Sequence, residues 1–359
     1  MSSSISTQSI LSDPHSTRSA WSSGSTVTPA SYAPALFTPP SHPPLKKLPQ
    51  FPPTWTDQQR ANIALLENHF NAPGYTLPTE DGSNERAPLH EREMMFLSRE
   101  CFLRFLYDTR NDARLAITRL EKTIVWRRTS RLDDIEGASD ELCEESKMGK
   151  NLVLGYTPTG QPVVYMFPSR NTGPLEIQRT MHVFFMLERA LDLMADGVTT
   201  VTLVIKFDET RQGPRMTAKV VSHIFRCVAD HYPWMLGRTV VHKLPRLIRA
   251  FTRLFWPFID APLREIVTFT STTVAEAKAV DNDQLLKDCG GDLDLPYDYE
   301  TYWPALMTAC HGRRADQELR WRSLGPPRAG REERRFKVAP STTSLTPPKR
   351  GLRKPVPLA

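Results

Sequence analysis

The chain has 359 residues, a formal net charge of +6, five cysteines and 31 prolines. It has no run of about 20 apolar residues that would span a bilayer, and its Ser-rich start lacks the apolar segment of a signal peptide. The cysteines are odd in number, scattered and without CxxC spacing, which argues against a disulfide framework or a zinc site. We therefore expect a reduced, cytoplasmic protein.

Both ends differ in composition from the middle. Residues 1–53 are dominated by Ser, Thr and Pro, with ten prolines, which predicts disorder. Residues 313–359 hold 13 Lys/Arg and 4 Asp/Glu, a net of +9, so the rest of the chain carries 6 − 9 = −3. We expect a disordered basic tail that attracts acidic lipid headgroups, and a folded part that does not bind nucleic acid.

Residues 54–140 are predicted to form a small all-helical unit. Helical patterns cover 54–70, 89–98, 99–109 and, after an N-cap at Asp112, 112–131. The last helix has a buried stripe at Leu115, Leu120, Ile124 and Val125. Residues 71–88, rich in Pro, Gly, Asn and Asp, are interpreted as a loop.

Residues 141–312 are predicted to form an α/β unit. Two strands surround a turn within 151–167, and further strands are expected at 199–207, 237–244 and 264–271. Helices are expected at 175–195 and 216–230, with helical pieces closing the fold at 282–289 and 295–313. Strand–helix alternation favours a mixed, mostly parallel sheet covered by helices.

One amphipathic helix stands out, beginning at Pro245 and ended or kinked by Pro257. Arginines occupy one face, and the opposite stripe is apolar: Leu247, Ile248, Phe251, Leu254, Phe255 and Phe258. Such a helix can cover a core, lie on an acidic membrane, or close over an apolar ligand. Periodicity alone favours core packing.

Several segments resemble one family. The stretch containing Arg104, Phe105, Leu106, Asp112, Trp126 and Arg127 resembles the helical preamble of the CRAL-TRIO (secretory lipid-transfer) family. GQPVVYM, HYPWMLGR, FWPFID and LLKDCGGDL resemble successive landmarks of the same family over roughly residues 92–295. MGKNLVLGY, HVFFMLERALDLM and YDYETYWPALM are similar to a fungal phosphatidylinositol-transfer-like branch linked to azole tolerance.

The resemblance implies a carrier that holds one lipid in a cavity floored by the sheet and closed by a mobile gate helix. Candidate cavity residues are Phe184, Val201, Leu203, Ile205, Phe207 and Phe225. The candidate gate residues are Leu247, Phe251, Leu254, Phe255 and Phe258. For any one of these residues the competing interpretation is ordinary core packing.

The headgroup positions depart from the family pattern. Where the best-understood members carry a basic pair this chain has Thr109 and Arg110, and Trp234 replaces a Glu. Where they carry Thr and Lys it has Leu263 and Ile266, and Val201 and Leu203 replace the small polar pair that contacts choline-lipid phosphate. A buried phosphodiester without a cation is costly, so a less charged ligand such as a sterol is an alternative to phosphatidylinositol. The remaining headgroup candidates are Arg110, Tyr232 and Arg264.

The function predicted from the sequence is therefore non-enzymatic lipid binding and transfer by a monomer that visits membranes transiently. No cofactor besides the bound lipid is expected, and the scattered histidines do not have the spacing of metal ligands. Two alternatives stay open. One is a lipid-sensing adaptor that presents its tail to a partner, and the other is an enzyme on this scaffold, disfavoured by the lack of a nucleophile motif.

Overall fold

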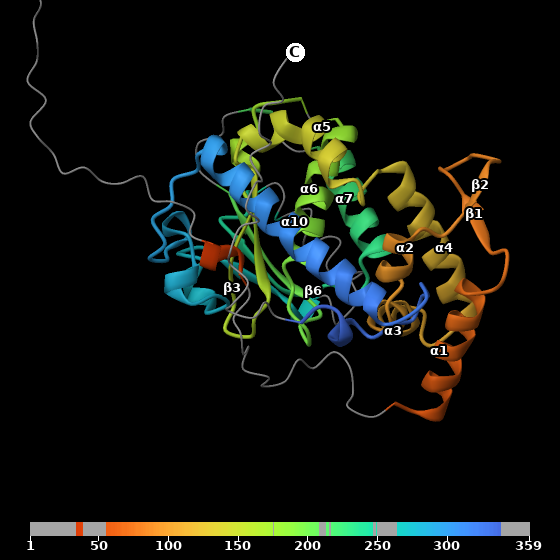
Figure 1. Cartoon of the computed structure of the whole chain (residues 1–359). Helices are drawn as coiled ribbons and strands as arrows, with labels where there is room; N and C mark the ends of the chain where they lie inside the picture. Colours follow the sequence, from red (N-terminus) through yellow and green to blue (C-terminus); the bar gives the residue numbers. More distant parts are fainter. Residues whose placement is uncertain are drawn as a thin grey trace, which may run out of the picture. The chain divides into compact units, whose positions relative to one another are not determined.

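The computed structural model describes residues 34–38, 55–174, 176–207, 213–214, 217–246, 249 and 264–338. Its N-terminal half begins with helices α1 (Asp57–Phe70), α2 (Glu91–Phe96), α3 (Arg99–Asp108) and α4 (Ala113–Thr129) (Figure 1). Caps explain where they start. Thr56 and Gln59 form a capping box before α1, and the Asp112 carboxylate accepts the backbone N–H groups of Arg114 and Leu115 at the start of α4.

Two details of this helical region correct the sequence prediction. The segment expected to be a loop contains an antiparallel hairpin, β1 (Thr76–Pro78) and β2 (Arg86–Pro88). These strands are only three residues long, too short for an alternating pattern to be recognised. Leu115 does not join the buried stripe, because its side chain is 48% exposed.

A five-stranded mixed sheet follows, in the order β3 (Asn151–Tyr156), β4 (Pro162–Met166), β5 (Val201–Lys206), β6 (Leu236–His242) and β7 (Val267–Thr270). β3 and β4 form an antiparallel hairpin, and every later neighbour is parallel. Helix α6 (Met181–Asp192) lies between β4 and β5 in the chain, and α7 (Ala218–His231) lies between β5 and β6. The predicted α/β fold with a mostly parallel sheet is confirmed.

Helix α5 (Ile135–Lys147) was not predicted as a separate helix, and the expected domain boundary at residue 140 falls inside it. Ile135 and Ala138 are buried in the same hydrophobic cluster as the sheet and α6. Helix α5 therefore packs with the α/β part. Its sequence holds five acidic residues and few apolar ones, which hid its buried face.

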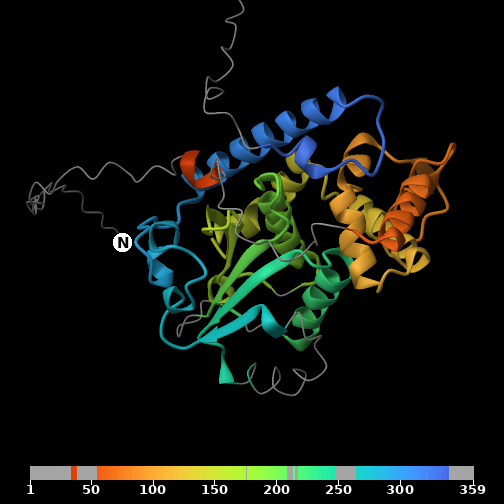
Figure 2. The ribbon, with the colours of Figure 1, turned by 90° about the horizontal axis from the view of Figure 1, so that it is seen from below.

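The expected boundary at residue 312 is wrong. Helix α10 (Tyr299–Ser323) continues past it, contacting α5 and α6 at one end and α2 at the other (Figures 1 and 2). The chain then packs against the N-terminal helices through Ala329, which is 0% exposed and joins their hydrophobic cluster, and further on Phe336 is 1% exposed. The basic composition of this segment suggested a disordered tail, but its charges are paired within the fold. Buried Glu333 accepts a hydrogen bond from Ser98 and forms an ion pair with Lys337.

The N-terminal prediction also needs one correction. Residues Pro34–Phe37 form a 3-10 turn, and Phe37 is 2% exposed, with its ring 6.1 Å from that of Tyr302 on α10. A short apolar motif inside a Pro-rich segment thus docks on the fold. After residue 38 the structure next describes the chain from Trp55.

The extent of the folded C-terminus can be tested by truncation. A chain ending at residue 338 should keep most of the unfolding free energy of the full chain, losing about 1 kcal/mol at most. A chain ending at Ser323 should lose about 4 kcal/mol or more, because it uncovers Trp321 and leaves Arg104 without Glu333. Urea unfolding followed by circular dichroism measures both, and equal stabilities would contradict the assignment.

Candidate lipid-binding site

The two faces of the sheet are packed differently. In the parallel register Val204 lies beside Tyr165 and Val240, and all three are 0% exposed. Neighbours in register share a face of the sheet, so the centre of this face is fully buried. The Tyr165 hydroxyl on this side donates to the backbone oxygen of Gln284, in the segment that follows β7.

The opposite face is apolar but incompletely covered. Its central residues Leu203 and Ile205 on β5 are only partly buried. Ile205 lies beside Val241, which in turn lies beside Phe269, and Phe269 is 46% exposed. Partly exposed apolar side chains on the central strand β5 and the edge strand β7 form a surface that an apolar ligand can cover. We call Leu203, Ile205, Val241, Val267 and Phe269 the open sheet face.

The structure separates the six predicted cavity residues. Leu203 and Ile205 belong to the open sheet face, and Phe207, 6% exposed, packs next to it with Val241 and Leu244. Val201 is fully buried in the main hydrophobic core.

Phe184 and Phe225 are not on this face. Phe184 is 0% exposed and stacks against Tyr232 at 6.1 Å, so it belongs to the core. Phe225 is 60% exposed on α7, whose buried residues are Val220 and Cys227. Phe225 was expected in the cavity, but it lies on the solvent side of α7, whereas the neighbouring Ile224 is partly buried.

The predicted gate residues Leu247, Phe251, Leu254, Phe255 and Phe258 lie outside the described part of the chain. Only the start of the helix can be compared with the prediction. The Arg249 N–H donates to the Pro245 carbonyl at 2.8 Å, which is an i to i−4 helical hydrogen bond. This hydrogen bond is consistent with a helix that begins near Pro245, and the gate assignment itself stays a prediction.

The three headgroup candidates lie in different environments. Arg110 is exposed in the α3–α4 loop, in a left-handed conformation with φ 54°. Tyr232 is 3% exposed and its hydroxyl donates to Glu188, so it is engaged inside the protein. Arg264 is partly buried, and its Nε makes no hydrogen bond to any described residue. Of the three, Arg264 is the one with a buried N–H group, at Nε, that lacks an acceptor among the described residues.

The positions that depart from the family pattern are apolar or already satisfied. The Thr109 hydroxyl donates to the Phe105 carbonyl at 2.9 Å. Trp234 has φ 57°, a left-handed conformation that is uncommon for a bulky residue, and its indole lies 6.1 Å from the ring of Tyr107. Leu263 lies outside the described residues. No anion-binding group is present at Thr109 or Trp234.

A buried ionic cluster connects the helical part to the α/β part. The Arg127 guanidinium on α4 donates to both Glu188 oxygens on α6, at 2.6 and 3.0 Å, and to Asp133 at 2.8 Å. The Tyr232 hydroxyl completes the Glu188 shell at 2.8 Å. Arg314 on α10 donates to Asp192 at 3.0 Å and to the Asp133 carbonyl at 3.0 Å. In the sequence analysis Arg127 was named only as part of the family resemblance, and its buried ion pairs were not predicted.

Burial shifts several pKa values near this cluster. Burial alone would raise the pKa of the Asp133 carboxyl, but Arg127 and Arg314 together lower it to about 2. Burial lowers the pKa of His182 to about 3, and its ring nitrogens face Ser146 and Asn151. Burial also lowers the pKa of His231 to about 4, and its ring stacks on Trp126 at 4.1 Å.

Comparison with known proteins now identifies the family. Residues 146–291 match the model of the CRAL/TRIO domain. The chain contains a CRAL-TRIO domain. The family predicted from sequence motifs is thereby confirmed, and the open sheet face lies within the matched residues.

Relatives of this CRAL-TRIO protein are fungal. A CRAL-TRIO domain-containing protein of Schizosaccharomyces pombe is 34% identical over 252 residues, which are 69% of this chain but 24% of that protein. The phosphatidylinositol transfer protein PDR17 of Saccharomyces cerevisiae is 28% identical over 276 residues, 72% of this chain and 77% of PDR17. The crystal structure of Sfh5 aligns with 69% of this chain and 92% of that chain, with a TM-score of 0.47 and 10% identity. None of the described helices is long and apolar enough to cross a membrane.

The buried histidines predict acid sensitivity above the range where carboxylates titrate. The unfolded chain binds a proton at His182 below pH 6.5, whereas the folded chain does so only near pH 3, so stability falls as pH falls. Between pH 7 and 5 this should cost about 2 kcal/mol for His182. Urea unfolding of His182→Gln should show a flatter pH dependence over this window, and an unchanged slope would contradict the assignment.

Proposed function

We propose that this protein is a non-enzymatic lipid carrier that holds one lipid against the open sheet face and exchanges it at membranes. The observation that carries the proposal is the incomplete burial of Leu203, Ile205 and Phe269 on an otherwise well-packed sheet. Covering about ten lipid methylenes would release roughly 8 kcal/mol, so escape into water would be slow and exchange would need a membrane. The gate helix over residues 245–258, the cytoplasmic location and the monomeric state remain predictions.

The headgroup positions of this chain argue against a strongly charged lipid. PDR17 is named a phosphatidylinositol transfer protein, and phosphatidylinositol is the default expected for this family. Here Thr109 is saturated by backbone acceptors, Trp234 replaces an acid, and Arg264 alone offers a partly buried cation with a free donor. We therefore favour a ligand whose polar group needs few charged partners, such as a sterol or a weakly charged lipid.

The bound lipid is best identified by mass spectrometry of the purified chain under native conditions. One lipid per chain, with transfer between donor and acceptor vesicles, is the expected result. Stoichiometric phosphatidylinositol would refute the headgroup argument while leaving the carrier intact. Lipid binding without transfer would instead support the lipid-sensing adaptor, the second function considered from the sequence.

The open sheet face itself can be filled by mutation. Ile205→Trp adds volume where the lipid is proposed to lie, so lipid uptake should fall about fivefold or more while the fold loses only about 1–3 kcal/mol. The matched control is Phe225→Trp, because Phe225 is 60% exposed on α7. Vesicle-to-protein transfer of a fluorescent lipid measures both variants. Equal uptake by the two variants would place the ligand elsewhere.

A further inference from the structure

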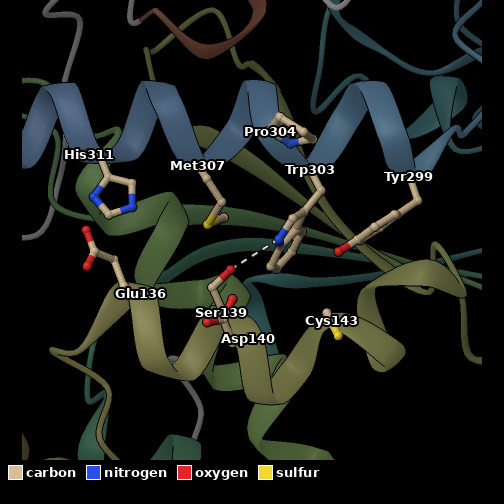
Figure 3. A pocket seen from close by; sticks show the side chains of 9 residues that line it. All are labelled: Glu136, Ser139, Asp140, Cys143, Tyr299, Trp303, Pro304, Met307 and His311. Carbon is tan, nitrogen blue, oxygen red and sulfur yellow. Dashed lines mark hydrogen bonds between the residues drawn. The ribbon is translucent and has the colours of Figure 1, made fainter. Parts of the chain in front are cut away.

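A groove of about 450 Å³ runs between α5 and α10, apart from the open sheet face (Figure 3). Its α10 side is largely aromatic and apolar, formed by Tyr299, Trp303, Pro304 and Met307, with His311 at the end nearest Glu136. The Trp303 indole N–H donates to the Ser139 hydroxyl on α5 at 3.1 Å, and the Tyr299 ring stacks on Trp303. The aromatic wall is therefore held in place before any ligand arrives.

The α5 side of the groove is acidic, and its two carboxylates differ from the other acids of α5 in their lack of ion pairs. Glu136 and Asp140 are exposed, lie one turn apart and form no ion pair with a described residue. The other acidic side chains of α5 are all engaged: Glu141 with Arg131, Glu144 with Lys147, and Glu145 with Lys150 and Arg179. Carboxylates beside an aromatic wall suit a proline-containing basic peptide, because prolines pack on aromatic rings and the cations meet the carboxylates.

We propose that the groove binds the C-terminal segment of the same chain, residues 347–358. This segment reads PPKRGLRKPVPL, with four Lys/Arg, four prolines and no acidic residue. Prolines on both sides of the basic residues match a groove whose aromatic wall faces two unpaired carboxylates. The charges are complementary, +4 on the segment against two carboxylates in the groove.

The described chain ends close enough to the groove for this segment to reach it. The last described residue, Val338, is held on α10 itself, where its carbonyl accepts hydrogen bonds from Arg313 at 2.9 Å and Arg320 at 3.0 Å. The middle of the groove lies about 17 Å further back along the helix axis, and crossing to another helix face adds about 10 Å. Residues 339–346, which precede the segment, span up to about 29 Å when extended, which is enough to reach the groove. Binding within one chain also gains a high effective concentration over any peptide in solution.

A cysteine in the groove allows binding of the segment to be measured. Cys143 lines it and is partly exposed, whereas the other four cysteines are buried. A bound segment would shield this thiol, so ending the chain at residue 338 should raise the rate of Cys143 alkylation by N-ethylmaleimide about threefold or more. Removing the basic segment disfavours the reactive thiolate, so a rate increase cannot come from electrostatics.

The groove acids provide the second arm of the test. Glu136→Lys with Asp140→Lys should release the segment, so that truncation at 338 has no further effect on the alkylation rate in this background. The matched control is Glu80→Lys with Asp81→Lys, the same charge change at exposed residues of the β1–β2 hairpin loop. In that control, truncation should still accelerate alkylation as it does in the natural sequence.

Three results would overturn the proposal. The first is an alkylation rate that truncation leaves unchanged. The second is an effect of truncation that persists in the Glu136→Lys, Asp140→Lys variant. The third is shielding that grows with protein concentration and accompanies a dimer in size-exclusion chromatography, because the groove would then bind the segment of a second copy.

Discussion

The buried ion cluster around Arg127 is the interaction on which the rest of the structure depends. Arg127 on α4, Glu188 on α6 and Tyr232 before β6 come from three separate parts of the chain, and Arg314 adds α10 through Asp192 and Asp133. Removing one member of a buried pair costs about 3–5 kcal/mol, because the partner charge is left without compensation. The helical unit, the sheet layer and α10 must therefore fold together.

This arrangement separates stability from ligand binding. The centre of the sheet face with Val204 and Val240 is fully buried, and α10 adds its own packing through Trp303 and Leu306. The open sheet face contributes less to the packing, so under the proposed function a lipid would enter or leave it without disrupting the core. A carrier needs this separation, because it must stay folded in both the loaded and the empty state.

Much of the fold was predictable because the spacing of apolar residues along a short segment indicates which of its faces is buried. The strands at β3 to β7 and the helices α3, α4, α6 and α7 follow apolar patterns of period 2 or 3.6, and caps at Thr56 and Asp112 mark two helix starts. The site was only partly predictable. Leu203 and Ile205 were correctly placed on one face, but alternation could not show that Val201 and Phe184 lie in the core or that Phe225 faces solvent.

The sequence by itself determined the family, the α/β class and the loss of the usual headgroup residues, because each is encoded in residue types at short spacing. Only the tertiary structure decided where the folded chain ends and which charges are buried. Residues 313–338 look like part of a basic tail, yet Arg313 and Arg314 are buried and bonded, and Glu333 is held by Ser98 and Lys337. Composition counts charges one at a time, whereas burial depends on partners that lie more than a hundred residues away.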